Sequence, residues 1–399
     1  MKSLGVVLKI SERCNINCSY CYFFNGKDAS YKERPSLITE KTVMQVAKFL
    51  KDACIDLKLE SLSIGFHGGE PLMYKKANFA TMCNYFISEL QNLVDLEFTL
   101  QTNAMLVDEQ WIELFNRYNI KVGVSIDGPK EYHDTHRVDF RNKGTYERVV
   151  SKVLLLTKHQ SMISIGGVGA LCVINPAYDG KKIYRHFVDD LLITRMDFLL
   201  PDYTHDDVMP YSVDQYGKYM CAVFNEWVTD DNPDIEVRFS HSVLRLFLGK
   251  TGSLTYGNGP AVYGELPLIC IRGDGEVGPT DELMSTNPKS VTLTKAFVDT
   301  ISAKQLLMLP IFTEINKAQT DVPEACQECC WYNVCGSGGI VHRFSNKNRF
   351  NNPSLYCNSL KDYYAEVAKY LLNQGYPLNN ILARLGLLNT AVNCEQLQG

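Results

Sequence analysis

The sequence lacks long apolar runs and a strong net charge. None of its 399 residues falls in a stretch approaching the roughly 18 apolar residues of a membrane span, and the apolar part of MKSLGVVLKI is too short for a secretory signal. The 40 Lys and Arg residues nearly balance 45 Asp and Glu residues, giving a formal net charge of -5 without any polybasic stretch. We therefore expect a cytoplasmic protein that binds neither a membrane nor nucleic acid.

The composition is otherwise that of a globular protein, with 45% hydrophobic and 21% charged residues. The chain is long enough for a large core or two domains. Its 14 cysteines occur without an export signal, which favours reduced thiols and metal ligands over a disulfide framework. Cysteine spacing is therefore the most informative feature of this sequence.

Short β-rich segments alternate with longer amphipathic segments over the first 228 residues. The expected strands are 5–10, 60–66, 96–101, 122–126, 163–173 and 196–200, and the expected helices are 39–53, 77–93, 108–118, 145–158, 180–191 and 213–228. This alternation predicts an α/β fold with parallel strands. We expect an open, partial (β/α)6 TIM-like barrel whose active site lies at the carboxyl ends of the strands.

Three cysteines, Cys14, Cys18 and Cys21, follow the first expected strand with CxxxCxxC spacing. A structural zinc site needs four ligands, whereas three thiolates can hold a [4Fe–4S] cluster that keeps one iron open. Unrelated buried cysteines are the alternative interpretation. With Tyr20 before the last cysteine, the motif resembles the signature of the radical SAM superfamily. That resemblance implies that the open iron binds S-adenosylmethionine, which is cleaved to a 5′-deoxyadenosyl radical.

Further motifs of the chain resemble cofactor contacts of the same superfamily. In isolation the GGEP stretch could be a simple turn, and the arginine a solvated charge. In series with the cysteines, the resemblance implies cofactor-binding roles for Tyr20, Gly68, Gly69, Glu70, Ser125, Arg137 and Leu171. The glycines are expected to let the backbone approach the methionine amino group of the cofactor.

A second cysteine group comprises Cys326, Cys329, Cys335 and Cys357. Its spacing alone is compatible with zinc or with an iron–sulfur cluster. After a radical SAM core it resembles the SPASM domain, which carries auxiliary [4Fe–4S] clusters. Two further ligand positions of that pattern are occupied here by Gly339 and Thr280. We therefore expect two [4Fe–4S] clusters, one radical SAM and one auxiliary.

These motifs suggest a division of the chain into four parts. We expect a radical SAM partial barrel over 1–228, a bridge over 229–264, a SPASM-like auxiliary cluster domain over 265–360 and a C-terminal helical tail over 361–399.

Three separated stretches resemble the cyclophane-forming peptide maturases of the Xye and Grr type. They are MDFLLPDYTHD, GDGEVGPTDEL and CGSGGIVHRF continuing to NNPSLYC. The resemblance implies a peptide cyclase that joins an aromatic ring to a side-chain Cβ of a ribosomal precursor peptide, with a flavodoxin or ferredoxin as reductant. An anaerobic sulfatase-maturating enzyme, which forms formylglycine, is the nearest alternative. A zinc-stabilised binding protein is an alternative from another class.

The expected chemistry needs a base beside the substrate. Asp281 follows a DG turn at the position where related sulfatase maturases carry a catalytic aspartate, which makes it our candidate base. His67, directly before GGEP, and His205 and Asp206, after the sixth expected strand, are candidate substrate contacts. A turn aspartate and ordinary loop composition are the alternative interpretations.

Overall fold

The fold is built around one curved sheet of nine strands. The computed structural model describes residues 3–250 and 268–388. The strand order in the sheet is β11-β10-β1-β3-β4-β5-β7-β8-β9. The bounds are β1 Ser3–Ser11, β3 Ser61–Gly68, β4 Asp95–Thr102, β5 Lys121–Ser125, β7 Val168–Val173, β8 Arg195–Leu199, β9 Glu236–Val237, β10 Leu268–Ile271 and β11 Val277–Pro279. All neighbouring strands are parallel except β10 and β11.

The six expected strands are present as β1, β3, β4, β5, β7 and β8, so the predicted α/β class with a parallel, barrel-like sheet is confirmed. Their alternate residues are buried, as in β3, where Leu62, Ile64 and Phe66 face the core. One boundary differs, because the expected strand 163–173 begins with the end of a short helix, α6 (Gln160–Ser164). The apolar residues there pack at helical spacing before Gly166 and Gly167 turn the chain into β7.

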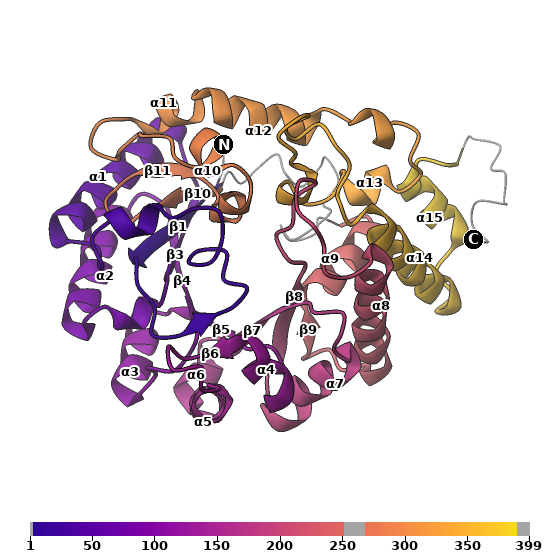
Figure 1. Cartoon of the computed structure of the whole chain (residues 1–399), viewed down its shortest axis with the longest axis horizontal. Coiled ribbons are helices and arrows are strands. Elements are labelled where there is room, and N and C mark those ends of the chain that lie inside the picture. The colour runs from indigo at the N-terminus through magenta and orange to yellow at the C-terminus, as the bar shows by residue number, and fades with distance from the viewer. Residues whose placement is uncertain (1–2, 251–267, 389–399) are drawn as a thin grey trace.

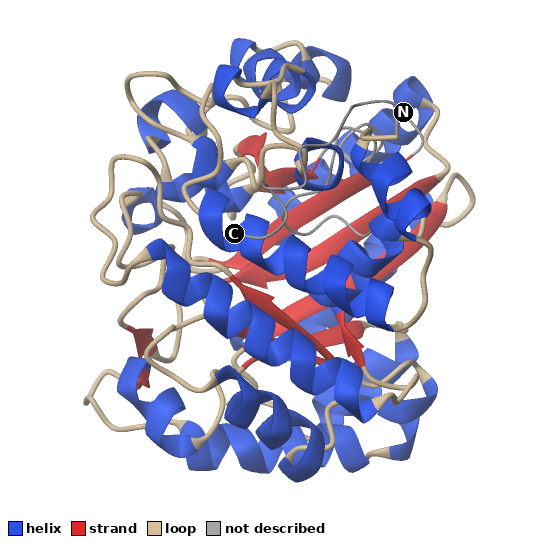
Figure 2. Cartoon of the chain, turned by 90° about the vertical axis from the view of Figure 1, so that its right-hand side faces the viewer, coloured by secondary structure: helices blue, strands red, loops and turns tan. Residues whose placement is uncertain are grey.

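Helices cover the outer face of the sheet (Figures 1 and 2). The predicted helices correspond to α1 Glu40–Leu57, α2 Lys76–Leu90, α3 Glu109–Arg117, α5 Tyr146–Lys158, α7 Gly180–Arg185 with the π-helical turn His186–Asp190, and α8 Val213–Asp230. Side-chain caps fix several of their starts; for example, Thr39 accepts a hydrogen bond from the backbone N–H of Thr42, and Asp108 accepts one from the backbone N–H of Trp111. None of the helices in the described ranges is long and apolar enough to cross a membrane.

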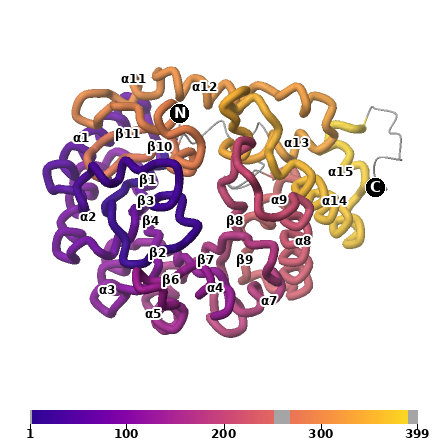
Figure 3. Tube along the Cα trace, in the orientation of Figure 1, coloured from indigo at the N-terminus to yellow at the C-terminus, as the bar shows by residue number. Residues whose placement is uncertain are grey.

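The carboxyl-terminal third returns to the sheet before it forms its own helices. Strand β10 pairs in parallel with β1, so the segment that begins at residue 265 contributes to the edge of the barrel sheet (Figure 3). Helix α14 (Cys357–Asn373) packs against α8, and a shorter helix, α15 (Leu378–Leu385), follows it. The division at residue 265 therefore stays a proposal. Of the expected bridge, 251–264 lie outside the described residues, as do 389–399 of the expected tail.

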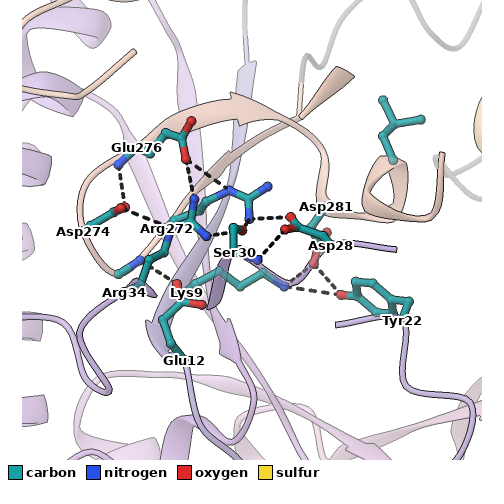
Figure 4. Close-up of polar contacts among 12 residues, drawn as sticks. Lys9, Glu12, Tyr22, Asp28, Ser30, Arg34, Arg272, Asp274, Glu276 and Asp281 are labelled. Carbon is teal, nitrogen blue, oxygen red and sulfur yellow. Dashed lines mark hydrogen bonds and ion pairs between the residues drawn. The ribbon is translucent and has the colours of Figure 1, made fainter. Parts of the chain in front are cut away.

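Buried ion pairs attach the β10–β11 hairpin to the loop after β1 (Figure 4). Arg34 pairs with Glu276 at 2.5 Å and with Asp274 at 3.1 Å, and Arg272 pairs with Asp28 at 3.0 Å. Both arginine side chains are almost fully buried. Charges in such an environment must stay paired, because an uncompensated buried charge is strongly destabilising. The pairs therefore hold the hairpin and the loop in one arrangement.

We predict that Glu276→Gln lowers the free energy of unfolding by about 3 kcal/mol, because the buried Arg34 loses a charged partner. The remaining pair of Arg34 with Asp274 limits the loss. Anaerobic denaturant unfolding would measure the change. The matched control is Asp52→Asn, which removes the exposed pair with Lys48 and is expected to change the stability by less than about 0.5 kcal/mol. Equal effects of the two variants would contradict a structural role of the buried pairs.

Candidate active site

A cavity of about 760 Å³ opens at the carboxyl ends of the parallel strands. Cys14, Cys18 and Cys21 line it. Of the other residues expected at the site, it is also lined by Tyr20, His67, Gly68, Gly69, Ser125, Arg137 and Leu171. Most of the candidate cofactor-binding residues identified from the sequence therefore line this one cavity.

The cysteine loop is anchored by a small second sheet. Strand β2 (Asn17–Cys18) pairs antiparallel with β6 (Arg137–Val138), and Cys18 lies opposite Arg137 in this register. The guanidinium group of Arg137 reaches the sulfur of Cys18 at 3.9 Å. The pairing brings residues 119 positions apart to one place, which no local pattern in the sequence specifies.

The two glycines of GGEP lie directly against the segment that leads into Cys14. A Cβ on Gly68 would stand 2.1 Å from the carbonyl oxygen of Ser11, and one on Gly69 would stand 2.3 Å from that of Arg13. The backbone N–H of Gly69 donates to Ser11 at 2.8 Å. The space that the glycines leave free is therefore taken by the chain itself, which fixes the start of the cysteine loop.

Glu70 turns away from the cavity into the protein and is fully buried. Its carboxylate accepts hydrogen bonds from the backbone N–H groups of Leu72 and Asn103 and from the hydroxyl of Thr102, at 2.7 to 2.9 Å. Burial raises the pKa of Glu70 to about 7, against the effect of these donors. The side chain thus holds the loop after β4, and Glu70, although expected as a cofactor contact, is not among the residues that line the cavity.

Arg137 and Asp127 form a buried ion pair at 2.9 Å on the cavity wall. The hydroxyl of Tyr20 donates to the same carboxylate oxygen at 2.5 Å, and the guanidinium lies over the Tyr20 ring at 5.4 Å. Although burial opposes its charge, Asp127 and Tyr20 keep the pKa of Arg137 well above the ordinary value. This fixed positive charge beside Cys18 suits a carboxylate ligand.

Two other expected cofactor contacts are positioned by the sheet. The Ser125 hydroxyl at the end of β5 accepts a hydrogen bond from the Gln101 side chain at 2.8 Å. The Leu171 carbonyl in β7 accepts from the N–H of Ile126 at 3.0 Å, and a carbonyl oxygen has a second lone pair for a ligand.

Asp281 forms a cluster with Lys9 and Tyr22 (Figure 4), and His67 joins it through Lys9. Lys9 is fully buried, and the other three residues are partly exposed. The Lys9 ammonium, which is fully buried in β1, forms an ion pair with Asp281 and contacts Nδ1 of His67 at 2.9 Å and the Tyr22 hydroxyl at 3.3 Å. Tyr22 in turn donates to Asp281 at 2.5 Å. An ammonium group has three donors, so all of them are used here.

The charges of this cluster shift two pKa values in the same direction. Burial raises the pKa of Asp281, but the Lys9 charge and the hydrogen bonds from Lys9 and Tyr22 outweigh it and hold the pKa well below its usual range. Burial and the Lys9 charge lower the pKa of His67 to about 4. At neutral pH the cluster therefore contains a carboxylate, an ammonium group and a neutral imidazole.

His205 and Asp206, expected as substrate contacts, do not lie at this cavity. His205 contacts the carbonyl oxygen of Pro353 through Nε2 at 2.9 Å, and Asp206 accepts from Asn346 at 2.8 Å. Both side chains are exposed and tie the loop after β8 to the carboxyl-terminal segment. The same loop places Asp202 and Tyr203 in the cavity wall instead.

The second cysteine group lines a separate pocket. Cys326 and Cys335 end two short helical segments, Glu324–Cys326 and Tyr332–Cys335, Cys329 lies between these segments, and Cys357 is the first residue of α14. The Ser337 hydroxyl lies in this pocket, buried and without a hydrogen-bond partner among the described residues. Four thiols and an unpaired donor fit an iron–sulfur cluster, whose sulfur atoms accept hydrogen bonds.

Lys9 is a residue of the site that the sequence analysis does not identify, because it lies within the expected apolar strand 5–10. The available signal was a single charge within GVVLKI, since a lysine in a buried parallel strand needs an anion. Its partner lies 272 positions away, which no sequence pattern reveals.

Comparisons with known proteins agree with this geometry. Residues 8–170 match the family model described as Radical SAM superfamily. The chain is 26% identical to a cysteine-type anaerobic sulfatase-maturating enzyme of Clostridium perfringens over 94% of this chain and 98% of the relative. It is also 26% identical to a serine-type enzyme of Bacteroides thetaiotaomicron, over 95% of this chain and 94% of the relative. These relatives overturn the predicted cyclophane-forming activity and favour its alternative.

The fold is shared with a solved structure described as native anSMEcpe with bound AdoMet and Cp18Cys peptide. The TM-score is 0.77 at 21% identity, over 93% of this chain and 98% of that chain. Together with the cysteine motifs, the matches assign S-adenosylmethionine and two [4Fe–4S] clusters as cofactors. Residues 8–170 thus form a radical SAM domain, and the comparisons support a radical SAM oxidoreductase.

Proposed function

We propose that this enzyme oxidises a cysteine or serine side chain of a peptide to formylglycine, the reaction that its resemblance to anaerobic sulfatase-maturating enzymes implies. The observation that carries the proposal is the similarity to cysteine-type and serine-type sulfatase-maturating enzymes over more than nine-tenths of the chain. The large open cavity beside Asp281 supports it, because a peptide segment needs such space. A flavodoxin or ferredoxin is our proposed electron donor.

The reaction removes one hydrogen atom, one proton and one electron from the target side chain. A cysteine becomes a thioaldehyde, which exchanges its sulfur for the oxygen of water, and a serine becomes the aldehyde directly. When bound, S-adenosylmethionine and the first cluster supply the radical that takes the hydrogen atom from Cβ, and the second cluster supplies an electron acceptor. The protein must supply the acceptor for the proton.

Asp281 is the proposed proton acceptor. Its pKa lies below the usual range because of the Lys9 charge and the hydrogen bonds from Lys9 and Tyr22, so it is ionised throughout the neutral pH range. Its contacts Tyr22 and His67 line the cavity, so Asp281 stands directly behind the wall that a substrate would meet. A carboxylate with so low a pKa is a weak base, and the role therefore requires that the target thiol or hydroxyl becomes more acidic once Cβ has lost its hydrogen atom.

His67 is the proposed hydrogen-bond donor to the peptide. An ammonium group can only donate, so the contact of Lys9 with Nδ1 makes that nitrogen the acceptor. The ring is neutral, since its pKa is about 4, and its proton is therefore on Nε2. His67 lines the cavity and thus offers an N–H group, as a glutamine at this position would.

The proposal predicts a defined product from defined peptides. Anaerobically reconstituted enzyme, incubated with S-adenosylmethionine, a reductant and a peptide from a sulfatase maturation site, should convert its target cysteine or serine to an aldehyde. Mass spectrometry would show loss of two hydrogens for serine, and loss of two hydrogens together with replacement of sulfur by oxygen for cysteine, and a hydrazide reagent would trap the product. Formation of 5′-deoxyadenosine with both peptides unchanged would contradict the proposal.

We predict that Lys9→Met makes peptide oxidation depend on pH. Without the Lys9 charge, burial raises the pKa of Asp281, so the proton acceptor is ionised in the wild type but progressively protonated in the variant as the pH falls. Product formation in the variant should fall about a hundredfold or more at neutral pH and recover as the pH rises. The formation of 5′-deoxyadenosine should continue.

The matched control for this prediction is Lys48→Met, which removes an exposed lysine of a surface pair. It should leave the pH profile unchanged. A Lys9→Met enzyme that keeps its iron and oxidises the peptide at the wild-type rate over the whole pH range would remove Asp281 from the mechanism.

His67→Gln and His67→Leu separate hydrogen bonding from proton transfer. Glutamine keeps an N–H donor, so the KM for the peptide should stay within about threefold of the wild-type value. Leucine removes the donor, and the KM should rise about tenfold, as expected for one lost hydrogen bond of about 1.4 kcal/mol. Steady-state kinetics would measure both. If both variants lost kcat to the same extent, His67 would be a proton-transfer residue and not a donor.

A further inference from the structure

Two hydroxyl groups are directed at the second cysteine pocket, one from a residue that lines it and one bonded to a thiol that lines it. One belongs to Ser337, which lines the pocket directly. The other belongs to Tyr364, whose hydroxyl forms a hydrogen bond with the sulfur of Cys335. Ser337 is 3% exposed and Tyr364 is fully buried. Both groups are donors in a place where the acceptors are sulfur atoms.

Ser337 adopts a backbone conformation that disfavours a serine. Its φ angle is +72°, and its neighbours in the same left-handed region, Gly336 and Gly338, are glycines. A Cβ on Gly338 would stand 2.5 Å from the Ser354 side chain, so that glycine is required by space as well. A side chain at position 337 therefore strains the backbone where a glycine would be accommodated freely.

The hydroxyl of Ser337 adds a second destabilising contribution. Its oxygen is buried and has no hydrogen-bond partner among the residues that the structure describes. A buried donor left unpaired is destabilising by about 1 to 3 kcal/mol. Backbone strain and an unpaired donor at one residue are together unfavourable unless the hydroxyl bonds to whatever occupies the pocket.

Tyr364 approaches the same pocket from helix α14. The helix begins at Cys357, so one rigid element carries both a thiol of the pocket and the hydroxyl directed at another. Its neighbour Tyr363 is equally buried, but the hydroxyl of Tyr363 donates to Ser240 at 2.8 Å, away from the pocket. The two tyrosines therefore form a natural pair of test and control positions.

We propose that the hydroxyls of Ser337 and Tyr364 donate hydrogen bonds to the sulfur atoms of the auxiliary cluster and raise its reduction potential. A reduced cluster carries one more negative charge than an oxidised one, so donors directed at its sulfur atoms stabilise the reduced state. The two side chains would thereby make the auxiliary cluster a better electron acceptor. The proposal rests on the cluster assignment and is independent of which peptide the enzyme oxidises.

The test is a redox titration of the holoenzyme followed by electron paramagnetic resonance. The signal of the first cluster is identified by its change on addition of S-adenosylmethionine, and the remaining signal reports the auxiliary cluster. Ser337→Ala and Tyr364→Phe should each lower its potential, and the double variant should lower it further. For Ser337→Ala we expect the ratio of reduced to oxidised cluster at fixed potential to fall about tenfold, equivalent to about 59 mV for one electron.

Three further variants separate hydrogen bonding from structure. Ser337→Gly relieves the backbone strain but also lacks the hydroxyl, so its potential should match that of Ser337→Ala. Tyr363→Phe and Ser359→Ala remove buried hydroxyls that are bonded elsewhere, to Ser240 and to the carbonyl of Val213, and should leave the potential unchanged.

Two outcomes would overturn the proposal. One is a wild-type potential in both Ser337→Ala and Tyr364→Phe at full iron content. The other is a lowered potential in Ser337→Ala together with a wild-type potential in Ser337→Gly. That result would assign the change in potential to backbone strain. If Ser337→Ala fails to retain its cluster, Tyr364→Phe decides the question, because it removes a single oxygen atom from a rigid helix.

Discussion

A buried lysine in the first strand determines how that strand must meet the segment after β11. Lys9 lies on the first strand of the sheet, in a run of apolar residues, and its ammonium group is completely shielded from water. A charge in that position requires an anion, and among the described residues Asp281, which begins a short helical turn after β11, forms the ion pair with it. The pairing of β10 with β1 delivers that segment.

The same interaction organises the chemistry around it. Because the Lys9 ammonium has three donors, it orients Asp281, His67 and Tyr22 relative to one another. Tyr22 directly follows Cys21 of the first cysteine motif, and His67 directly precedes the GGEP stretch. The Lys9 ammonium group therefore holds the proposed base, the loop with the first cysteine motif and the loop with the GGEP stretch in fixed positions relative to one another. A displacement of the β10–β11 hairpin would disturb all three, and the ion pairs of Arg34 and Arg272 oppose it.

Local sequence patterns predicted the structural features that depend on residues close together in the sequence. They did not predict the features that depend on contacts between distant residues. The six parallel strands, most helices and the gathering of Cys14, Cys18 and Cys21 on one cavity followed from periodicity and spacing. The edge strand β10, the pairing of Cys18 with Arg137 and the inward turn of Glu70 are set by contacts far along the chain.

Loop positions were the weakest predictions for the same reason. His205 and Asp206 follow a strand, as site residues of a barrel do, but hydrogen bonds to residues 346 and 353 draw them out of the cavity. The cyclophane assignment failed differently. It depended on short stretches of resemblance, whereas similarity over the whole chain points to the sulfatase-maturating relatives.

The two cysteine pockets are connected through the cavity wall. The carbonyl oxygen of Pro201, after β8, accepts hydrogen bonds from the Tyr356 hydroxyl at 2.9 Å and from the buried imidazole of His342. Tyr356 immediately precedes Cys357, a residue of the second pocket, while Pro201 immediately precedes Asp202 in the cavity wall. The residues that would face a peptide are thus held by the segment that holds the second group of thiols. Loss of order in the second pocket would loosen the substrate wall as well as remove an electron acceptor.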